Sequence, residues 1–269
     1  MLGLSVAAIA LGYLSWRFVE TPIRRGTIPL FASRRSVFTA SAGVASLLIV
    51  LGMAGYLAGG VPSRFSSEQL AILGTAEFDR RTAYRGGTCF LDPDQPFTEF
   101  GDDCTPSGSA AMIWGDSHAA ALSVGLREQV PALSQLTASG CPPLIGVDIG
   151  WRPHCKPIND HLLETVAATR PDTLYLHANW LLYADDLDIA DLSRTVDAVG
   201  RASPSTRVVI VGGVPQWPPS LPEYSVRSGL NPLASIRLPN RTIRDVRDID
   251  DRLRAVAEAG PALFISLID

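Results

Sequence analysis

An uncharged apolar run limits most strongly what this chain can be. From Val37 to Val61 the sequence contains no Asp, Glu, Lys or Arg, and about 20 apolar residues are enough to cross the hydrocarbon core of a bilayer. The run also helps to explain why the mean hydropathy of the chain is positive, at +0.17. We therefore expect a transmembrane helix in this segment.

The first residues of the chain form a second apolar segment, Met1–Trp16. It lacks the charged start and the small-residue cleavage site of a secretory signal peptide, so we interpret it as another transmembrane helix. The loop between the two segments holds one acid, Glu20, and five arginines: Arg17, Arg24, Arg25, Arg34 and Arg35. Because cytoplasmic loops are enriched in Lys and Arg, we expect this loop in the cytoplasm and everything after Val61 across the membrane.

Cysteine usage independently supports export of the second part of the chain. The sequence has 4 cysteines, and all of them follow Val61: Cys89, Cys104, Cys141 and Cys155. Four cysteines allow three pairings, which sequence alone does not resolve. We favour the local pairing, first with second and third with fourth, because each bond would close a loop of about 15 residues and contribute roughly 3 kcal/mol.

A zinc site is the weaker alternative for these cysteines, because the C-x-x-C and H-x-x-x-H spacings are absent. We therefore expect no metal. The formal net charge of -4 likewise gives no support for a nucleic-acid partner.

The part after Val61 shows a regular alternation of strand-like and helix-like segments beyond residue 109. A helical stretch, Glu68–Tyr84, and a polar loop over residues 85–109 come first. Strand-like apolar runs then alternate with helix-like segments. The strands are expected at Ala110–Trp114, Gln135–Ala138, Thr173–Ala178, Arg207–Val211 and Ala262–Ile268, and the helices at His118–Gln129, Asn159–Ala168, Asp191–Val199 and Ile243–Glu258. This alternation predicts an α/β domain with a parallel sheet covered on both faces.

Polar residues follow the first three of these strands. Asp116 and Ser117 follow the first strand, Gly140 the second and Asn179 the third. Ligands bind such sheets at the carboxyl ends of the strands. A serine in the first turn of a helix is well placed for a nucleophile, and a glycine N–H and an asparagine amide can stabilise an oxyanion.

The motifs at these positions resemble a known family. "WGDSHA", "SGCPPL" and "HANW" resemble the first three blocks of the SGNH hydrolase fold, and "WRFVETPIRR" near the N-terminus resembles the penultimate membrane helix of the acyltransferase-3 family. The resemblance implies a three-layer, flavodoxin-like sheet domain at residues 109–269. It would follow two transmembrane helices at residues 1–61 and a disulfide-bonded extension at residues 62–108.

The resemblance also implies an activity. Members of this family transfer acyl groups, usually acetyl from acetyl-CoA or another acyl-CoA, to a cell-envelope polysaccharide such as lipopolysaccharide. Ser117 would be the nucleophile, Gly140 and Asn179 would complete the oxyanion hole, and Asp116 would brace the serine turn rather than titrate. No cofactor would be bound. The expected location is the bacterial inner (plasma) membrane, with the SGNH-like domain in the periplasm or outside the cell.

Two departures from the family pattern lead to a further expectation. The family's base is the histidine of a D-x-x-H motif after the last strand, and this sequence reaches Asp269 without one. An acyltransferase-3 membrane domain also has more spans than the two assigned here. We therefore expect a piece of a longer enzyme, with its remaining membrane helices as partners, or a truncated gene product, inactive by itself.

The four histidines present are weaker candidates for the base. His118 adjoins Ser117, but neighbouring helix residues point in different directions. We expect surface or cap roles for His154 and His161 and a core or rim position for His177. Two alternatives to an acyltransferase stay open: an SGNH carbohydrate esterase, and an inactive glycan-binding remnant.

Overall fold

The computed structural model describes residues 2–25, 33–75, 78–217, 220–229 and 240–268. The chain divides into two compact units, Met1–Leu70 and Ala71–Asp269. The predicted domain boundaries after residues 61 and 108 stay predictions.

The first unit is helical. It contains α1 (Leu2–Ser15), the π-helical turn η1 (Trp16–Glu20), α2 (Thr21–Arg24), α3 (Arg34–Leu57) and the short turn η3 (Pro62–Arg64). Ser33 caps α3 by accepting a hydrogen bond from the backbone N–H of Ser36. Among the described residues, α3 is the one helix long and apolar enough to cross a membrane. Its apolar side chains are exposed all round, as a lipid-facing helix requires. The transmembrane assignment of α1 stays a prediction.

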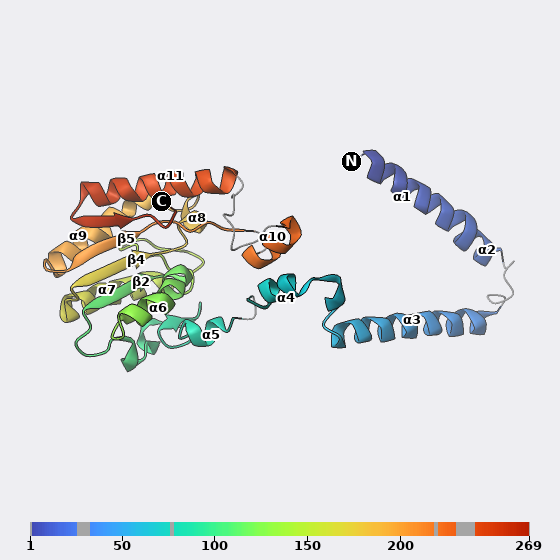
Figure 1. Ribbon diagram of the computed structural model, residues 1–269, viewed down its shortest axis with the longest axis horizontal. Helices are drawn as coiled ribbons and strands as arrows, with labels where there is room; N and C mark the ends of the chain where they lie inside the picture. The colour runs from blue at the N-terminus through green and yellow to red at the C-terminus, as the bar shows by residue number, and fades with distance from the viewer. Residues whose placement is uncertain (1, 26–32, 76–77, 218–219, 230–239, 269) are drawn as a thin grey trace. The chain divides into compact units, whose positions relative to one another are not determined.

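The second unit is built on a parallel sheet of six strands in the order β1-β3-β2-β4-β5-β6. Figure 1 labels its neighbouring strands β2, β4 and β5. The strands are β1 (Phe90–Leu91), β2 (Ala111–Gly115), β3 (Ser134–Ala138), β4 (Thr173–His177), β5 (Arg207–Val211) and β6 (Ala262–Ile265). The principal helices are α6 (Ser117–Gln129), α7 (Cys155–Thr169), α9 (Leu192–Ala202) and α11 (Asn240–Ala259), with α8 (Trp180–Tyr183), η7 (Ile189–Asp191) and α10 (Leu221–Ser228) between them. The predicted parallel α/β fold is confirmed.

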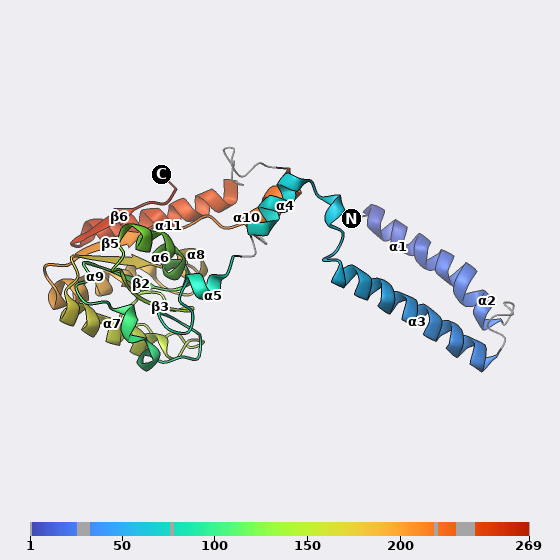
Figure 2. The same ribbon diagram turned by 60° about the horizontal axis from the view of Figure 1, so that its bottom comes forward.

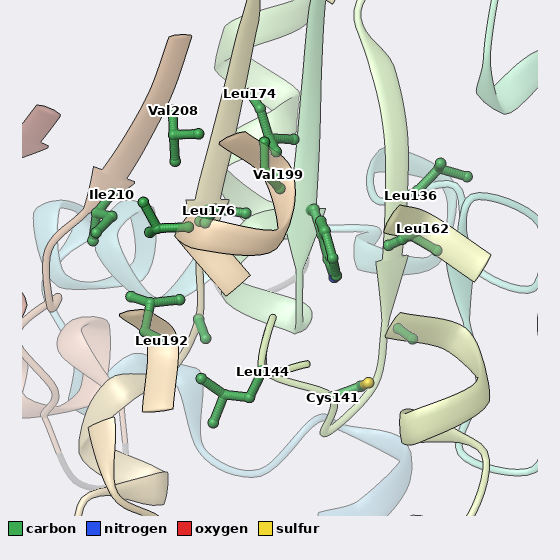
Figure 3. Packing of buried hydrophobic residues seen from close by; sticks show 14 of the residues in the cluster. Leu136, Cys141, Leu144, Leu162, Leu174, Leu176, Leu192, Val199, Val208 and Ile210 are labelled. Carbon is green, nitrogen blue, oxygen red and sulfur yellow. The ribbon is translucent and has the colours of Figure 1, made fainter. Parts of the chain in front are cut away.

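Successive side chains of the central strands point to opposite faces of the sheet and form two hydrophobic cores. Met112 and Trp114 of β2 face a large core formed with α7, α9 and α11, whereas Ala111 and Ile113 face a smaller core beneath α6. Figure 3 shows part of the large core, in which Leu174 and the other labelled apolar side chains gather. The helix α11 runs alongside β6, the strand into which it leads (Figure 2). Both sheet faces are therefore covered, as the sequence pattern predicted.

The segment before β2 differs from the expectation. Instead of one helix over Glu68–Tyr84, the structure has two short helices, α4 (Ser67–Gly74) and α5 (Arg80–Ala83), with residues 76–77 outside the described part. The polar loop contains β1 and two short turns, η5 (Phe97–Glu99) and η6 (Asp102–Cys104). The prediction of a plain loop was therefore wrong at β1, whose two residues pair with the edge of β3.

Both favoured disulfides are present. Cys89 is bonded to Cys104 and Cys141 to Cys155, with sequence separations of 15 and 14. The first bond holds the loop around β1, and the second closes the loop between β3 and α7. The predicted pairing is confirmed.

Candidate active site

Ser117 lies where β2 passes into α6. Asp116 is the N-cap of the helix, and Ser117 is its first residue, so the Ser117 backbone N–H has no acceptor within the helix. Gly115 makes this turn possible, because a Cβ there would overlap the carbonyl oxygen of His177 and lie 2.9 Å from the Ala119 Cβ. The sequence thus places a serine hydroxyl at the positive end of a helix.

Asp116 joins the serine turn to the turn after β4. Its Oδ1 accepts a hydrogen bond from the His118 N–H at 2.8 Å, and its Oδ2 accepts one from the Asn179 N–H at 2.9 Å and one from the Tyr183 hydroxyl at 2.7 Å. Burial raises the pKa of the Asp116 carboxyl, and the three donors oppose that rise. Burial and the nearby carboxylate also raise the pKa of Tyr183. This geometry suits a brace between two turns.

The predicted oxyanion donors share the edge of the sheet with Ser117. Gly115 pairs in register with Thr137 on one side and His177 on the other, so the turns after β2, β3 and β4 meet at their carboxyl ends. Gly140 adopts a φ of +63°, and within the described part of the chain its N–H has no hydrogen-bond acceptor. That N–H is therefore available for a ligand.

Gln216 orients the Asn179 side chain. Its Nε2 donates a hydrogen bond to the Asn179 Oδ1 at 2.6 Å. With Oδ1 engaged, the Asn179 Nδ2 is left as the donating end of the amide. Gln216 belongs to the segment after β5 that lies outside any helix or strand. A long-range contact of this kind leaves no local pattern, although the segment itself is rich in Gly and Pro.

Ser117 lines two cavities. The larger, of about 380 Å³, also contacts His118, His177, Val214 and Leu267, and the smaller, of about 260 Å³, is lined in addition by Phe90 and Asp92. Arg80 and Tyr84, from the α5 region, line both cavities together with Ser117. The extension before the sheet therefore supplies one wall of the cleft, a role that its polar composition did not predict.

Two histidines lie in the larger cavity. The His177 Nδ1 lies 3.2 Å from the Val211 carbonyl oxygen, so Nδ1 carries the proton and Nε2 is the basic nitrogen. The ring centroids of His118 and His177 lie 6.0 Å apart. Burial lowers the pKa of His118, and it lowers the pKa of His177 to about 4. Both rings are therefore neutral near pH 7. Among the described residues, neither makes a hydrogen bond with the Ser117 hydroxyl.

The remaining histidines lie elsewhere. His154 is the N-cap residue of α7 without a side-chain cap bond, and the His161 ring stacks on Phe97 with centroids 4.6 Å apart. Within the described residues, Asp103 lies close to the sulfurs of Cys89 and Cys104. Both sulfurs are engaged in the disulfide, so that cluster offers no thiolate to a metal.

The loop that carries Gly140 is fixed by buried polar contacts. Asn159 of α7 accepts a hydrogen bond from the Trp114 indole at 2.9 Å and donates to the carbonyl oxygens of Pro142 and Leu144. The Cys141–Cys155 bond ties the same loop to the start of α7. The disulfide was predicted from the cysteine spacing, whereas the Asn159 contacts could not be read from local sequence, because they join α7 to β2 and to the loop.

Comparisons with known proteins agree with this architecture. A family model described as "SGNH domain (fused to AT3 domains)" matches residues 78–269. No curated protein matches the chain in sequence. The structure resembles that of the lipopolysaccharide acetyltransferase periplasmic domain of Salmonella ser. Paratyphi A, with a TM-score of 0.54 and 20% sequence identity. That match covers 71% of this chain and 80% of the Salmonella chain, and at this identity it supports the fold alone.

Proposed function

Because the chain belongs to the family of SGNH domains fused to AT3 domains, we propose that it transfers an acyl group, most simply acetyl, to a hydroxyl of a cell-envelope polysaccharide through an acyl-Ser117 intermediate. The observation that supports the proposal is Ser117 in a cavity of about 380 Å³, at the carboxyl ends of β2, β3 and β4, the strands that the turns of Gly140 and Asn179 follow.

The proposed first step is acylation of Ser117. The Ser117 Oγ attacks the acyl carbonyl, the bond to the leaving group breaks, and the serine proton passes through a base to that leaving group. The Ser117 and Gly140 N–H groups and the Asn179 Nδ2 stabilise the oxyanion of the tetrahedral intermediate, and each such donor is worth about 3 kcal/mol. In the second step, a sugar hydroxyl takes the acyl group and returns a proton to the serine.

A base must take the Ser117 proton in the first step. The family resemblance assigns it to a histidine on the loop after the last strand. Leu267, two residues beyond β6, lines the same cavity as Ser117, so the chain leaving β6 passes close to the nucleophile. That placement supports the assignment. His118 and His177 line the cavity as neutral imidazoles and are the alternative bases.

Transfer and hydrolysis would share the same acyl-serine. We favour transfer because this SGNH domain belongs to a family fused to AT3 domains. The Salmonella protein of similar fold is a lipopolysaccharide acetyltransferase, and lipopolysaccharide is accordingly the first acceptor to test. In this proposal α3 anchors the chain in the inner membrane, the SGNH domain lies in the periplasm, and acyl-CoA is the distal donor acting through further membrane helices.

The test supplies the natural gene product that contains this chain, in detergent micelles, with p-nitrophenyl acetate and de-O-acetylated envelope polysaccharide from the encoding organism. We expect acetyl ester to appear on the polysaccharide and to disappear in Ser117→Ala. Ser117-dependent release of acetate without polysaccharide acetylation would replace the transferase by an esterase. Equal product from the wild type and Ser117→Ala would refute both.

A further inference from the structure

Trp151 is exposed although it is rigidly mounted beside the candidate oxyanion hole. Its side chain is 60% exposed, whereas Trp114 and Trp180 are each 1% exposed. The indole nevertheless lies directly against Gly140, because a Cβ on Gly140 would lie 2.6 Å from the Trp151 Cζ3 and 2.9 Å from its Cη2. One part of the ring therefore rests on the oxyanion loop, and the rest meets solvent.

The residue after Trp151 anchors the backbone turn that carries this ring. Arg152 is 1% exposed. Its guanidinium donates hydrogen bonds to three backbone carbonyl oxygens: Nε to Ser139 at 2.7 Å, Nη2 to Asp92 at 2.9 Å and Nη1 to Pro93. Three donors thus tie the Trp151 turn to the Gly140 loop and to the loop after β1. The Cys141–Cys155 bond closes the segment that contains both Gly140 and Trp151.

These anchors join the Trp151 turn to a residue of the smaller cavity. Asp92, whose carbonyl binds Arg152, lines the smaller cavity together with Ser117. Ser139 donates its N–H to Leu91, the residue before Asp92, at 2.9 Å. The Trp151 turn and the Gly140 loop are therefore linked, through the residues after β1, to the wall of a cavity that Ser117 lines. A ligand held at Ser117 and large enough to extend beyond the cavity can reach the indole.

We propose that the Trp151 indole is a stacking platform for a sugar ring of the acceptor, one that positions a hydroxyl beside acyl-Ser117; this rests on the proposed function. The flat C–H face of a pyranose matches an aromatic face in shape and in polarity, since the π face carries partial negative charge. A rigid Trp supplies such an area at little cost in conformational entropy. Its fixed mounting suits a subsite better than a mobile side chain would.

The experiment titrates de-O-acetylated envelope polysaccharide from the encoding organism into the full chain carrying Ser117→Ala, by calorimetry in detergent micelles. Adding Trp151→Ala should raise the Kd about tenfold, the size of one stacking contact. Adding Trp151→Phe should raise it by clearly less, and Trp151→Leu should behave like the alanine variant. Leu263→Ala removes a 54% exposed apolar side chain on β6 and is the matched control, with unchanged Kd.

Three results would overturn the subsite: an unchanged Kd in Trp151→Ala, equal Kd values for Trp151→Leu and Trp151→Phe, or no binding to the Ser117→Ala parent. Equal Kd values for Trp151→Leu and Trp151→Phe would mean that the Trp151 side chain acts only by packing on Gly140. Wild-type tryptophan fluorescence should also change on binding, and that change should be lost in Trp151→Phe. Failure of Ser117-dependent acetyl transfer would instead refute the proposed function, and the titration would still report on Trp151.

Discussion

At the scale of single residues, two polar side chains organise the proposed chemistry without contacting substrate. Asp116 accepts hydrogen bonds from the serine turn and from the turn of Asn179, so one carboxylate links the two turns. Gln216 holds the oxygen of the Asn179 amide and leaves its NH₂ as a donor. Preorganised donors of this kind are the usual source of oxyanion stabilisation, because no reorganisation is needed when charge develops.

Gln216→Glu tests this positioning role. The new carboxylate cannot donate to Asn179 Oδ1 and would instead accept from Nδ2, drawing the donor away from the cavity. We expect kcat for Ser117-dependent ester cleavage to fall about tenfold or more, with a smaller change in KM. Gln216→Ala should lose less activity, because nothing then competes for Nδ2. An unaltered kcat in Gln216→Glu would contradict the assignment.

His177 predicts a particular pH dependence of stability. Burial lowers its folded-state pKa to about 4 from the ordinary value of 6.5. Between these values the unfolded chain binds a proton that the folded chain does not, so the free energy of unfolding should fall as the pH drops from 6.5 towards 4. The full loss would be about 3 kcal/mol.

Urea denaturation of the full chain across that pH range measures this effect. His177→Gln should reduce the slope, to which His118 also contributes because burial lowers its pKa, and His154→Gln should leave the slope in place. A slope that persists unchanged in His177→Gln would show that another group controls it.

At the scale of elements, the loop between β3 and α7 carries more of the site than its length suggests. It holds Gly140 and Trp151, and it is fixed by Asn159 and by the Cys141–Cys155 bond. Replacing Cys141 and Cys155 together by Ser should lower the free energy of unfolding by about 3 kcal/mol, in line with the length of the closed loop. Thermal unfolding measures the change.

The same double substitution should reduce Ser117-dependent activity at temperatures where the chain stays folded, because Gly140 loses its support. Cys89→Ser with Cys104→Ser is the matched control, since that bond lies outside the β3–α7 loop. If both double variants lose activity equally, the loop has no special role.

The strands illustrate what sequence could predict. The five longer strands were found because each is a short apolar run bounded by polar turns, and the first residues after β2, β3 and β4 were identifiable as candidates for the same reason. The strand β1 escaped detection, since its two residues lie in a polar loop and pair only through tertiary contact. Trp151 and Gln216 were missed for a similar reason: their contacts join loops distant in sequence.

At the scale of the whole molecule, the chain combines an apolar helix with an exported catalytic domain in our proposal. The helix α3 has the length and hydropathy to cross a membrane, and the second unit contains both disulfides, which oxidising compartments favour. An arginine-rich loop before α3 would keep that end in the cytoplasm. This arrangement would present Ser117 to glycans on the far side of the membrane.

The most direct test of the account is the site at which an acyl group becomes attached. The natural gene product that contains this chain is treated with p-nitrophenyl acetate, quenched in acid and digested, and its peptides are sequenced by mass spectrometry. We predict acetyl on Ser117, with less label in Asn179→Ala and none at this position in Ser117→Ala. Acetyl on another residue, with Ser117 unmodified in the wild type, would contradict the central claim.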